Sequence, residues 1–228
     1  YTLIRKEKLL YIVNQMNKLT YLLGAVVLGT VVFTAKAEAQ TRQQPEALLI
    51  AQAKPQDKEQ PGKIPTNLTS NDEKNIEALI NQASEDLEKG NLTAAIAKCN
   101  AILKIDKQNF PAYVLRGLAN TGLKQYQVAV TDFEQAIQIN PNSHYSYFGR
   151  GFARYHLKLY QESLADFDQT IKIEPEYAHA YYWRGISKGF LGNKQGAISD
   201  LGTAAELYKK QGKPEDAKDA LDLIKQIG

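Results

Sequence analysis

The sequence predicts an all-α protein built from stacked helical hairpins. The motif Tyr-x-x-Arg-Gly occurs three times, beginning at Tyr113, Tyr147 and Tyr181, and each copy starts 34 residues after the previous one. A fixed period of this length is typical of two-helix units that stack on one another. Each period is divided by a break, and proline stands where the second helix of the middle copies should end, at Pro141 and Pro175.

Composition and charge exclude two classes of protein. The 228 residues carry a net charge of +3, and five basic against two acidic groups lie in residues 1–39, which leaves 23 of each sign beyond them. A neutral chain lacks the basic face that a nucleic-acid binder needs to replace phosphate counterions. Cys99 is the single cysteine, so an intrachain disulfide and a thiolate metal cluster are excluded.

Residues 1–39 have the layout of a secretory signal peptide. A short positive segment at Met16–Lys18 precedes the apolar run 19–33, and small residues alternate up to Ala39, where we expect cleavage. The run is shorter than the roughly 20 residues that span a bilayer. An uncleaved membrane anchor at 19–33 is the alternative. Met16 is the only methionine, so residues 1–15 are either upstream read-through or a long leader. The expected location is exported, either periplasmic or lumenal.

Residues 40–70 are expected to form a flexible linker rich in glutamine and proline. Such a segment buries too little apolar surface to offset its ordering entropy. Glu46–Ala51 within it favours at most a transient helix. The capping box Ser70-Asn-Asp-Glu73 predicts the start of the first stable helix.

Residues 71–211 are expected to hold four copies of the repeat. They run in register over 76–109, 110–143, 144–177 and 178–211. Gly212 and Pro214 then open a last helix, so residues 212–228 are expected to cap the stack.

The copies resemble the tetratricopeptide repeat (TPR) family, which implies a right-handed α-solenoid. The family has small residues at the eighth and twentieth positions, an aromatic at the twenty-fourth and proline at the thirty-second. The matching residues are Gly117, Gly151 and Gly185; Ala129 and Ala197; Phe133 and Phe167; and Pro141 and Pro175. The small residues let the two helices approach closely, and the aromatic ring fills the space beside them. Cys99 stands where Phe133 and Phe167 stand, and we interpret it as a core residue.

An Arg–Asp pair recurs in the last three copies and predicts a structural ion pair. Arginine holds the seventh position and aspartate the twenty-third, whereas the first copy has Gln82 and Lys98 there. The predicted pairs, within a hairpin or between neighbours, are Arg116 with Asp132, Arg150 with Asp166, and Arg184 with Asp200.

The resemblance also implies a concave groove lined by aromatic side chains of the third and fourth copies. An exposed apolar patch of this kind usually marks a partner site, although any single ring can instead pack on a neighbouring repeat. The residues expected there are Tyr145, Phe148, Phe152, Tyr155, His156, His179, Tyr182, Ile186 and Phe190. The Lys, Asn and Arg that grip a carboxylate in some TPR domains are missing, which favours an apolar peptide or helix as the ligand.

The leading hypothesis is therefore a non-catalytic protein–protein interaction scaffold that binds a protein or peptide and needs no cofactor. A membrane-anchored assembly factor for a membrane protein complex is the alternative. A His-dependent metal protein or enzyme is disfavoured, because His156 and His179 lack a clear carboxylate partner and no catalytic motif stands out.

Overall fold

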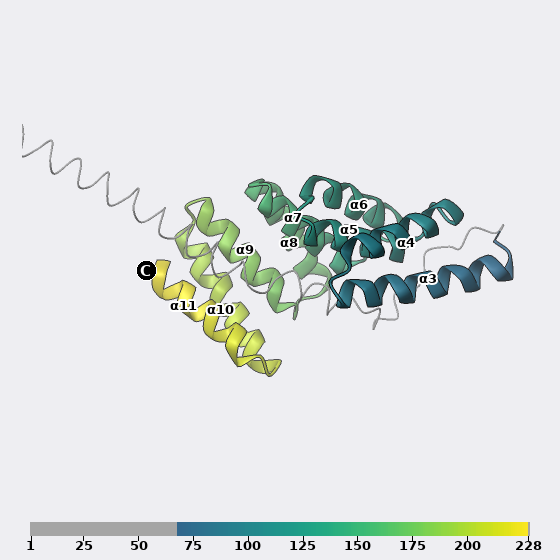
Figure 1. Ribbon diagram of the computed structural model, residues 1–228. Helices are drawn as coiled ribbons and strands as arrows, with labels where there is room; N and C mark the ends of the chain where they lie inside the picture. Colours follow the sequence, from purple (N-terminus) through teal and green to yellow (C-terminus); the bar gives the residue numbers. More distant parts are fainter. Residues whose placement is uncertain (1–67, 228) are drawn as a thin grey trace, which may run out of the picture. The chain divides into compact units, whose positions relative to one another are not determined.

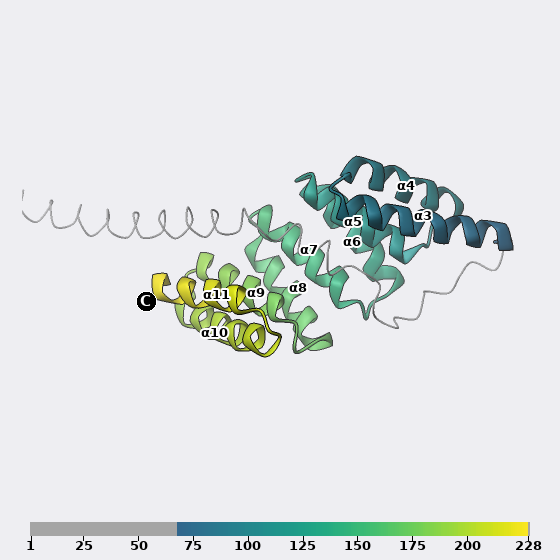
Figure 2. The same ribbon diagram turned by 60° about the horizontal axis from the view of Figure 1, so that its bottom comes forward.

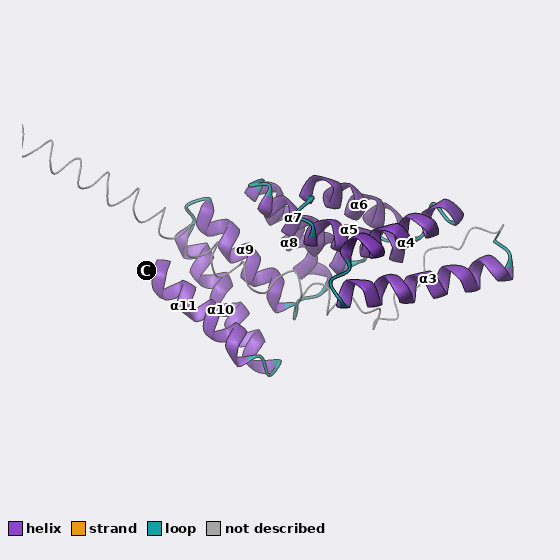
Figure 3. Ribbon diagram, in the orientation of Figure 1, coloured by secondary structure: helices purple, strands orange, loops and turns teal. Residues whose placement is uncertain are grey.

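The structure is a computed structural model that describes residues 68–227, and all regular structure in this range is helical (Figures 1 and 3). The signal-peptide and linker predictions for residues 1–67 lie outside the described residues. No helix within 68–227 combines the length and apolar character needed to cross a bilayer. The helices are α3 (Ser70–Glu88), α4 (Leu92–Ile105), α5 (Phe110–Gly122), α6 (Tyr126–Ile139), α7 (His144–His156), α8 (Tyr160–Ile173), α9 (Ala178–Phe190), α10 (Lys194–Lys210) and α11 (Pro214–Ile227).

Each helix packs against the next one along the chain, so α3 to α10 form four hairpins and α11 lies against α10 (Figure 2). The first helices of successive hairpins also contact one another: α3 touches α5, α5 touches α7 and α7 touches α9. The predicted stack of helical hairpins is confirmed. The first helices form the side of the stack where neighbouring repeats approach each other.

The first helix begins one residue away from the predicted capping box. Thr69, rather than Ser70, is the N-cap: its Oγ1 accepts from the backbone N–H of Asp72 at 3.2 Å, and its own N–H donates to the Asp72 carboxylate at 3.1 Å. These two reciprocal hydrogen bonds satisfy two backbone N–H groups that have no acceptor within the helix.

The small residues at the hairpin contacts are tightly enclosed, as predicted. A Cβ placed on Gly117 would lie 2.9 Å from Cζ of Phe133, and one on Gly151 would lie 2.9 Å from Cε1 of Phe167. Ala129, Ala197, Phe133 and Phe167 are fully buried. Cys99 is also fully buried, and burial raises the pKa of its thiol to about 12, so it is a core residue.

The residue at which the second helix of a repeat ends depends on whether a proline comes after it. Helices α6 and α8 end two residues before Pro141 and Pro175. The fourth repeat has Lys209 in place of proline, and α10 continues to Lys210. The first repeat has Lys107 there, yet α4 ends at Ile105, because the Asp106 carboxylate accepts from the backbone N–H of Gln108 at 2.9 Å and stabilises a turn.

The capping helix α11 buries one face against the stack. Ala217, Ala220, Leu223 and Ile227 are buried. Leu221 and Ile224 remain partly exposed.

Candidate functional site

The nine residues predicted to line a groove fall into two groups. Five have little surface: Phe152 and Ile186 are fully buried, and Phe148, Tyr155 and His179 are at most 6% exposed. These five cannot offer side-chain surface to a partner in this arrangement, which corrects the expectation that they line an open groove. The other four are partly exposed on α7 and α9, namely Tyr145, His156, Tyr182 and Phe190.

The buried rings are packed against rings of the neighbouring repeat, which is the physical reason for the correction. Phe152 on α7 meets Trp183 on α9 edge to face, with ring centroids 4.8 Å apart. Phe148 lies 5.0 Å from Tyr177, the last residue of its own repeat and the N-cap of α9, also edge to face. Such aromatic pairs contribute about 0.5–1.5 kcal/mol each beyond the area they bury. The rings of the third and fourth repeats therefore join these repeats.

The partly exposed residues extend this cluster at its margins. His156 stacks on Tyr126 of the preceding repeat at 4.6 Å with an interplanar angle of 6°. Phe190 stacks on Tyr160 at 4.7 Å with an angle of 11°. Tyr182 lies edge to face with Trp183 at 5.7 Å. We call Tyr145, His156, Tyr182 and Phe190 the ring margin.

The two histidines of the predicted groove are structural groups in the neutral form. Burial lowers the pKa of His156 to about 4 and the pKa of His179 to about 3. The Nδ1 atom of His179 shares a hydrogen bond of 2.5 Å with the Tyr208 hydroxyl, which joins α9 to α10. Within residues 68–227, His, Cys, Asp and Glu form no group of three that suits a metal ion.

The predicted Arg–Asp pairs are confirmed in all three repeats. Nη2 of Arg116, Arg150 and Arg184 lies 2.7 Å from the carboxylate of Asp132, Asp166 and Asp200, respectively. The aspartates are at most 7% exposed at the side chain, so the pairs are largely desolvated.

Each of these arginines also makes contacts that the sequence reading did not foresee. Each guanidinium lies over the tyrosine three residues earlier, at 5.3–5.6 Å from the ring centroid. Arg116 donates to Asn100 on α4, and Arg184 donates to Asp168 on α8, so both reach the second helix of the preceding repeat. All three arginines therefore connect the two helices of their hairpin, and Arg116 and Arg184 also join it to the preceding hairpin.

A further partner of the buried aspartates was missed at the eleventh position of the repeat. There, Asn120 donates to Asp132 at 2.8 Å, Arg154 to Asp166 at 2.7 Å, and the ammonium group of Lys188 lies 2.7 Å from Asp200. In the first repeat the charges at these two positions are exchanged, and Lys98 pairs with Asp86. Comparison of the eleventh residues with the twenty-third would have revealed this pair, because their charges are opposite in the first, third and fourth copies.

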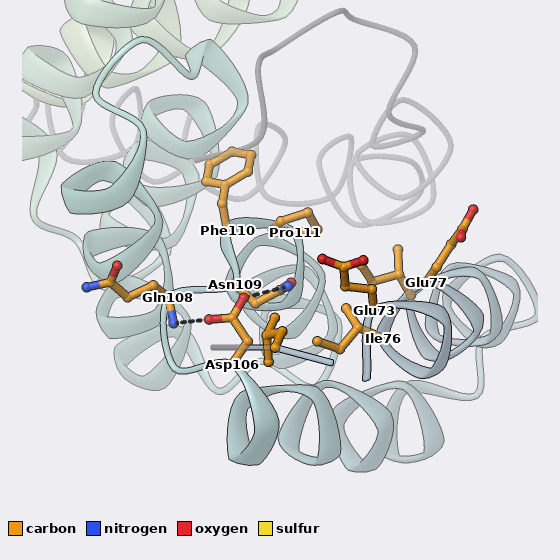
Figure 4. A pocket seen from close by; sticks show the side chains of 10 residues that line it. Glu73, Ile76, Glu77, Asp106, Gln108, Asn109, Phe110 and Pro111 are labelled. Atoms are coloured by element: carbon orange, nitrogen blue, oxygen red, sulfur yellow. Dashed lines mark hydrogen bonds between the residues drawn. The ribbon is translucent and has the colours of Figure 1, made fainter. Parts of the chain in front are cut away.

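Two more features escaped the sequence reading. A Cβ on Gly149 would lie 2.4 Å from Cζ of Phe133, closer than at either neighbouring glycine of the predicted pattern, so Gly149 is required where α7 crosses α6. A pocket of about 190 Å³ lies between α3 and the start of α5 (Figure 4).

Comparisons with known proteins agree with this architecture. Residues 110–143 match the sequence model of the tetratricopeptide repeat, and this range is the predicted second copy. No curated protein matches the sequence.

Solved structures share the fold at low sequence identity. The structure of MamA, residues 41 to the end, from Desulfovibrio magneticus RS-1 has a TM-score of 0.54 and 17% identity, with 67% of this chain and 94% of that chain covered. The first TPR of Spaghetti (RPAP3) bound to the HSP90 peptide SRMEEVD has a TM-score of 0.50 and 24% identity, with 52% and 94% covered.

An enzyme is also among the similar structures. An O-GlcNAc transferase mutant of Thermobaculum terrenum has a TM-score of 0.57 and 19% identity, with 63% of this chain but 27% of that chain covered. At these identities the likeness shows the fold alone. Residues 110–143 thus match a tetratricopeptide repeat, and the chain shares its stacked helix pairs with these structures.

Proposed function

We propose that this protein is a non-catalytic interaction scaffold that binds a polypeptide segment, extended or helical, against the ring margin on the first helices of the third and fourth repeats. The observation that carries the proposal is the position of Tyr145, His156, Tyr182 and Phe190, which keep partly exposed aromatic surface on α7 and α9. A similar fold, the first TPR of Spaghetti, is described as bound to a peptide.

The packing behind the ring margin supports this role. The buried rings beneath it hold α7 and α9 in fixed relative positions, so a ligand would meet a surface that is already formed. Rigid aromatic side chains give large contact area at low cost in side-chain entropy. The absence of a Lys, Asn and Arg carboxylate grip favours apolar side chains in the ligand over a free carboxylate terminus.

A pair of adjacent tyrosines allows a matched test. Tyr182 belongs to the ring margin, whereas Tyr181 is also partly exposed but lies under the Arg184 guanidinium. A peptide selected by display against the full chain should bind the Tyr182→Ser variant at least tenfold more weakly, as measured by isothermal titration calorimetry. The Tyr181→Ser variant should stay within about twofold. Equal losses in the two variants, or no loss in Tyr182→Ser, would contradict the proposal.

We further propose that the scaffold acts outside the cytoplasm, in a periplasmic or lumenal space. The support is the sequence pattern of residues 1–39. Expression in a bacterium, fractionation and intact mass measurement test it, with a mature chain that starts at Gln40 as the expected result. A membrane-bound product that retains residues 19–33 would favour the membrane-anchored assembly factor instead.

A further inference from the structure

The pocket in the first repeat has a mainly apolar wall and three carboxylates, those of Glu73, Glu77 and Asp106. It measures about 190 Å³ and lies between the N-terminal half of α3 and the turn that leads into α5. Figure 4 shows the labelled lining residues of α3 together with those of the turn that leads into α5. Its lining consists of Leu68, Glu73, Ile76, Glu77, Ile80, Asp106, Gln108, Asn109, Phe110 and Pro111.

The apolar part of the lining is accessible. Leu68, Ile80, Phe110 and Pro111 are partly exposed, and only Ile76 is buried. Apolar groups that border an open pocket gain free energy when a ligand covers them. These residues belong to α3 and to the start of α5. An apolar side chain that enters the pocket would therefore contact the hairpins of both the first and the second repeat.

Glu73 and Glu77 give the pocket its charge. They lie one helical turn apart on α3 and are both exposed. Neither forms an ion pair with any cation within residues 68–227, although Lys74 is adjacent to Glu73 in sequence. Like charges at this spacing repel each other, so the pair is unfavourable for α3 by itself. The whole helix has six acidic residues and one basic residue, in a chain whose net charge is +3.

Two hydrogen-bond donors of the opposite wall already have partners within that wall. Asp106 accepts from the backbone N–H of Gln108 at 2.9 Å and from Nδ2 of Asn109 at 3.1 Å. Oδ1 of Asn109 accepts from the N–H of Ala112 at 3.0 Å and caps α5, and Pro111 has no N–H to offer. An anion at this pocket would meet the carboxylates of Glu73, Glu77 and Asp106, whereas a cation would be attracted by them.

We propose that this pocket binds a polypeptide segment in which lysine or arginine alternates with a bulky apolar residue. The apolar side chain fills the cavity against Ile76, Ile80 and Pro111, and the cation pairs with Glu73 and Glu77. The methylene groups of the basic side chain cover the remaining apolar surface. This inference rests on the proposed function and gives its ligand a charge opposite to that of the acidic HSP90 peptide held by the first TPR of Spaghetti.

Two peptides of reversed charge test the proposal on the full chain. The probe is a fluorescein-labelled peptide Gly-Lys-Leu-Lys-Leu-Lys-Gly, and the comparison peptide has Glu in place of each Lys. Fluorescence anisotropy should show the basic peptide binding at least tenfold more tightly. Its affinity should fall when NaCl rises from 50 to 300 mM, because salt screens exposed charges. Equal affinity for the two peptides, or no binding of the basic one at millimolar concentration, would overturn the proposal.

A matched pair of charge-reversed variants locates the site. Glu73→Lys with Glu77→Lys should weaken binding of the basic peptide at least tenfold. Glu206→Lys with Glu215→Lys changes the net charge equally at exposed positions on α10 and α11, and it should change the affinity less than twofold. Circular dichroism melting confirms that both variants are folded. A tenfold loss in both variants would mean that general charge attraction, and not the pocket, holds the peptide.

The two proposals fail in different ways. A display-selected peptide that needs Tyr182 but tolerates reversal of Glu73 and Glu77, with no preference for basic residues, overturns the pocket and retains the ring margin. A display-selected peptide that needs Glu73 and Glu77 but is unaffected by Tyr182→Ser retains the pocket and overturns the ring margin.

Discussion

Some positions require glycine because an aromatic ring lies directly against the backbone. The repeat pattern does not reveal all of these positions. Gly149 and Gly117 both abut Phe133, but only Gly117 stands at a position where the pattern calls for a small residue. Phe133 is fully buried between α5 and α7 and has no room to move away. The tight contact at Gly149 depends on how two repeats cross, which periodicity alone does not specify.

Gly149→Ala should destabilise the protein by about 1–3 kcal/mol, because the new methyl group would overpack against Phe133. Gly202 in α10 is a suitable control, since a Cβ there meets nothing within 4 Å. Gly202→Ala should stabilise the protein by about 0.5–1 kcal/mol through helix propensity. Urea denaturation monitored by circular dichroism measures both changes, and equal effects of the two substitutions would contradict this packing.

Acid should destabilise the fold through His156 and His179. His156 and His179 have folded-state pKa values of about 4 and 3, below the unfolded value of 6.5. The unfolded chain therefore binds protons first as the pH falls below 6.5, and stability declines down to the folded pKa values. His156→Phe keeps a ring on Tyr126 but cannot titrate, so it should lose about 1–2 kcal/mol less than the wild type between pH 7 and pH 5. Urea midpoints at the two pH values measure this difference, and parallel losses would refute it.

At the scale of helices, the buried aspartates hold together the two helices of the second, third and fourth hairpins. Asp166 accepts from both Arg150 and Arg154, whose side chains are 17% and 20% exposed. Asp166→Asn should cost about 2–4 kcal/mol, because two guanidinium groups lose a desolvated partner. Asp168 is 61% exposed, and Asp168→Asn should cost at most about 1 kcal/mol. Thermal melts of the two variants compare these costs, and the ranking would be disproved if Asp168→Asn were the more damaging.

In the first repeat, the eleventh and twenty-third positions form an ion pair in which the charges are exchanged. Lys98→Asp alone should destabilise this repeat by about 1–2 kcal/mol, because the new carboxylate would face that of Asp86. The side chains of Lys98 and Asp86 are only 25% and 16% exposed, so water screens this repulsion little. Adding Asp86→Lys should recover most of the loss and reproduce the Lys188–Asp200 pair of the fourth repeat. A double-mutant cycle from urea titrations measures the coupling, and simply additive losses would contradict the pairing.

Sequence periodicity predicted the helices and the ion pairs between them well, because both depend on contacts that recur in each repeat. The helix pairs, enclosed glycines and Arg–Asp pairs depend on contacts within one repeat, which recur every 34 residues. Contacts between unlike repeats do not recur. Phe152 is buried because Trp183 occupies the sixth position of the next repeat, where the other copies have Asn81, Leu115 and Gly149. The burial of five predicted groove residues and the pocket at Pro111 are of this second kind.

At the scale of the whole chain, the first helices of the repeats touch one another and carry both proposed binding surfaces. The ring margin lies on α7 and α9, and the pocket of the first repeat lies between α3 and α5. The two surfaces differ in chemistry: one is aromatic and the other combines carboxylates with aliphatic side chains. One polypeptide that met both would need an apolar segment and a basic segment.

Hydrogen–deuterium exchange of the full chain, with and without a display-selected peptide, tests the central claim most directly. If the first helices form the binding side, bound peptide should slow exchange in α7 and α9, extending to α3 and α5 for a peptide that also contains basic residues, and should leave α6, α8 and α10 unchanged. Protection confined to the second helices, or none at saturating peptide, would contradict the account.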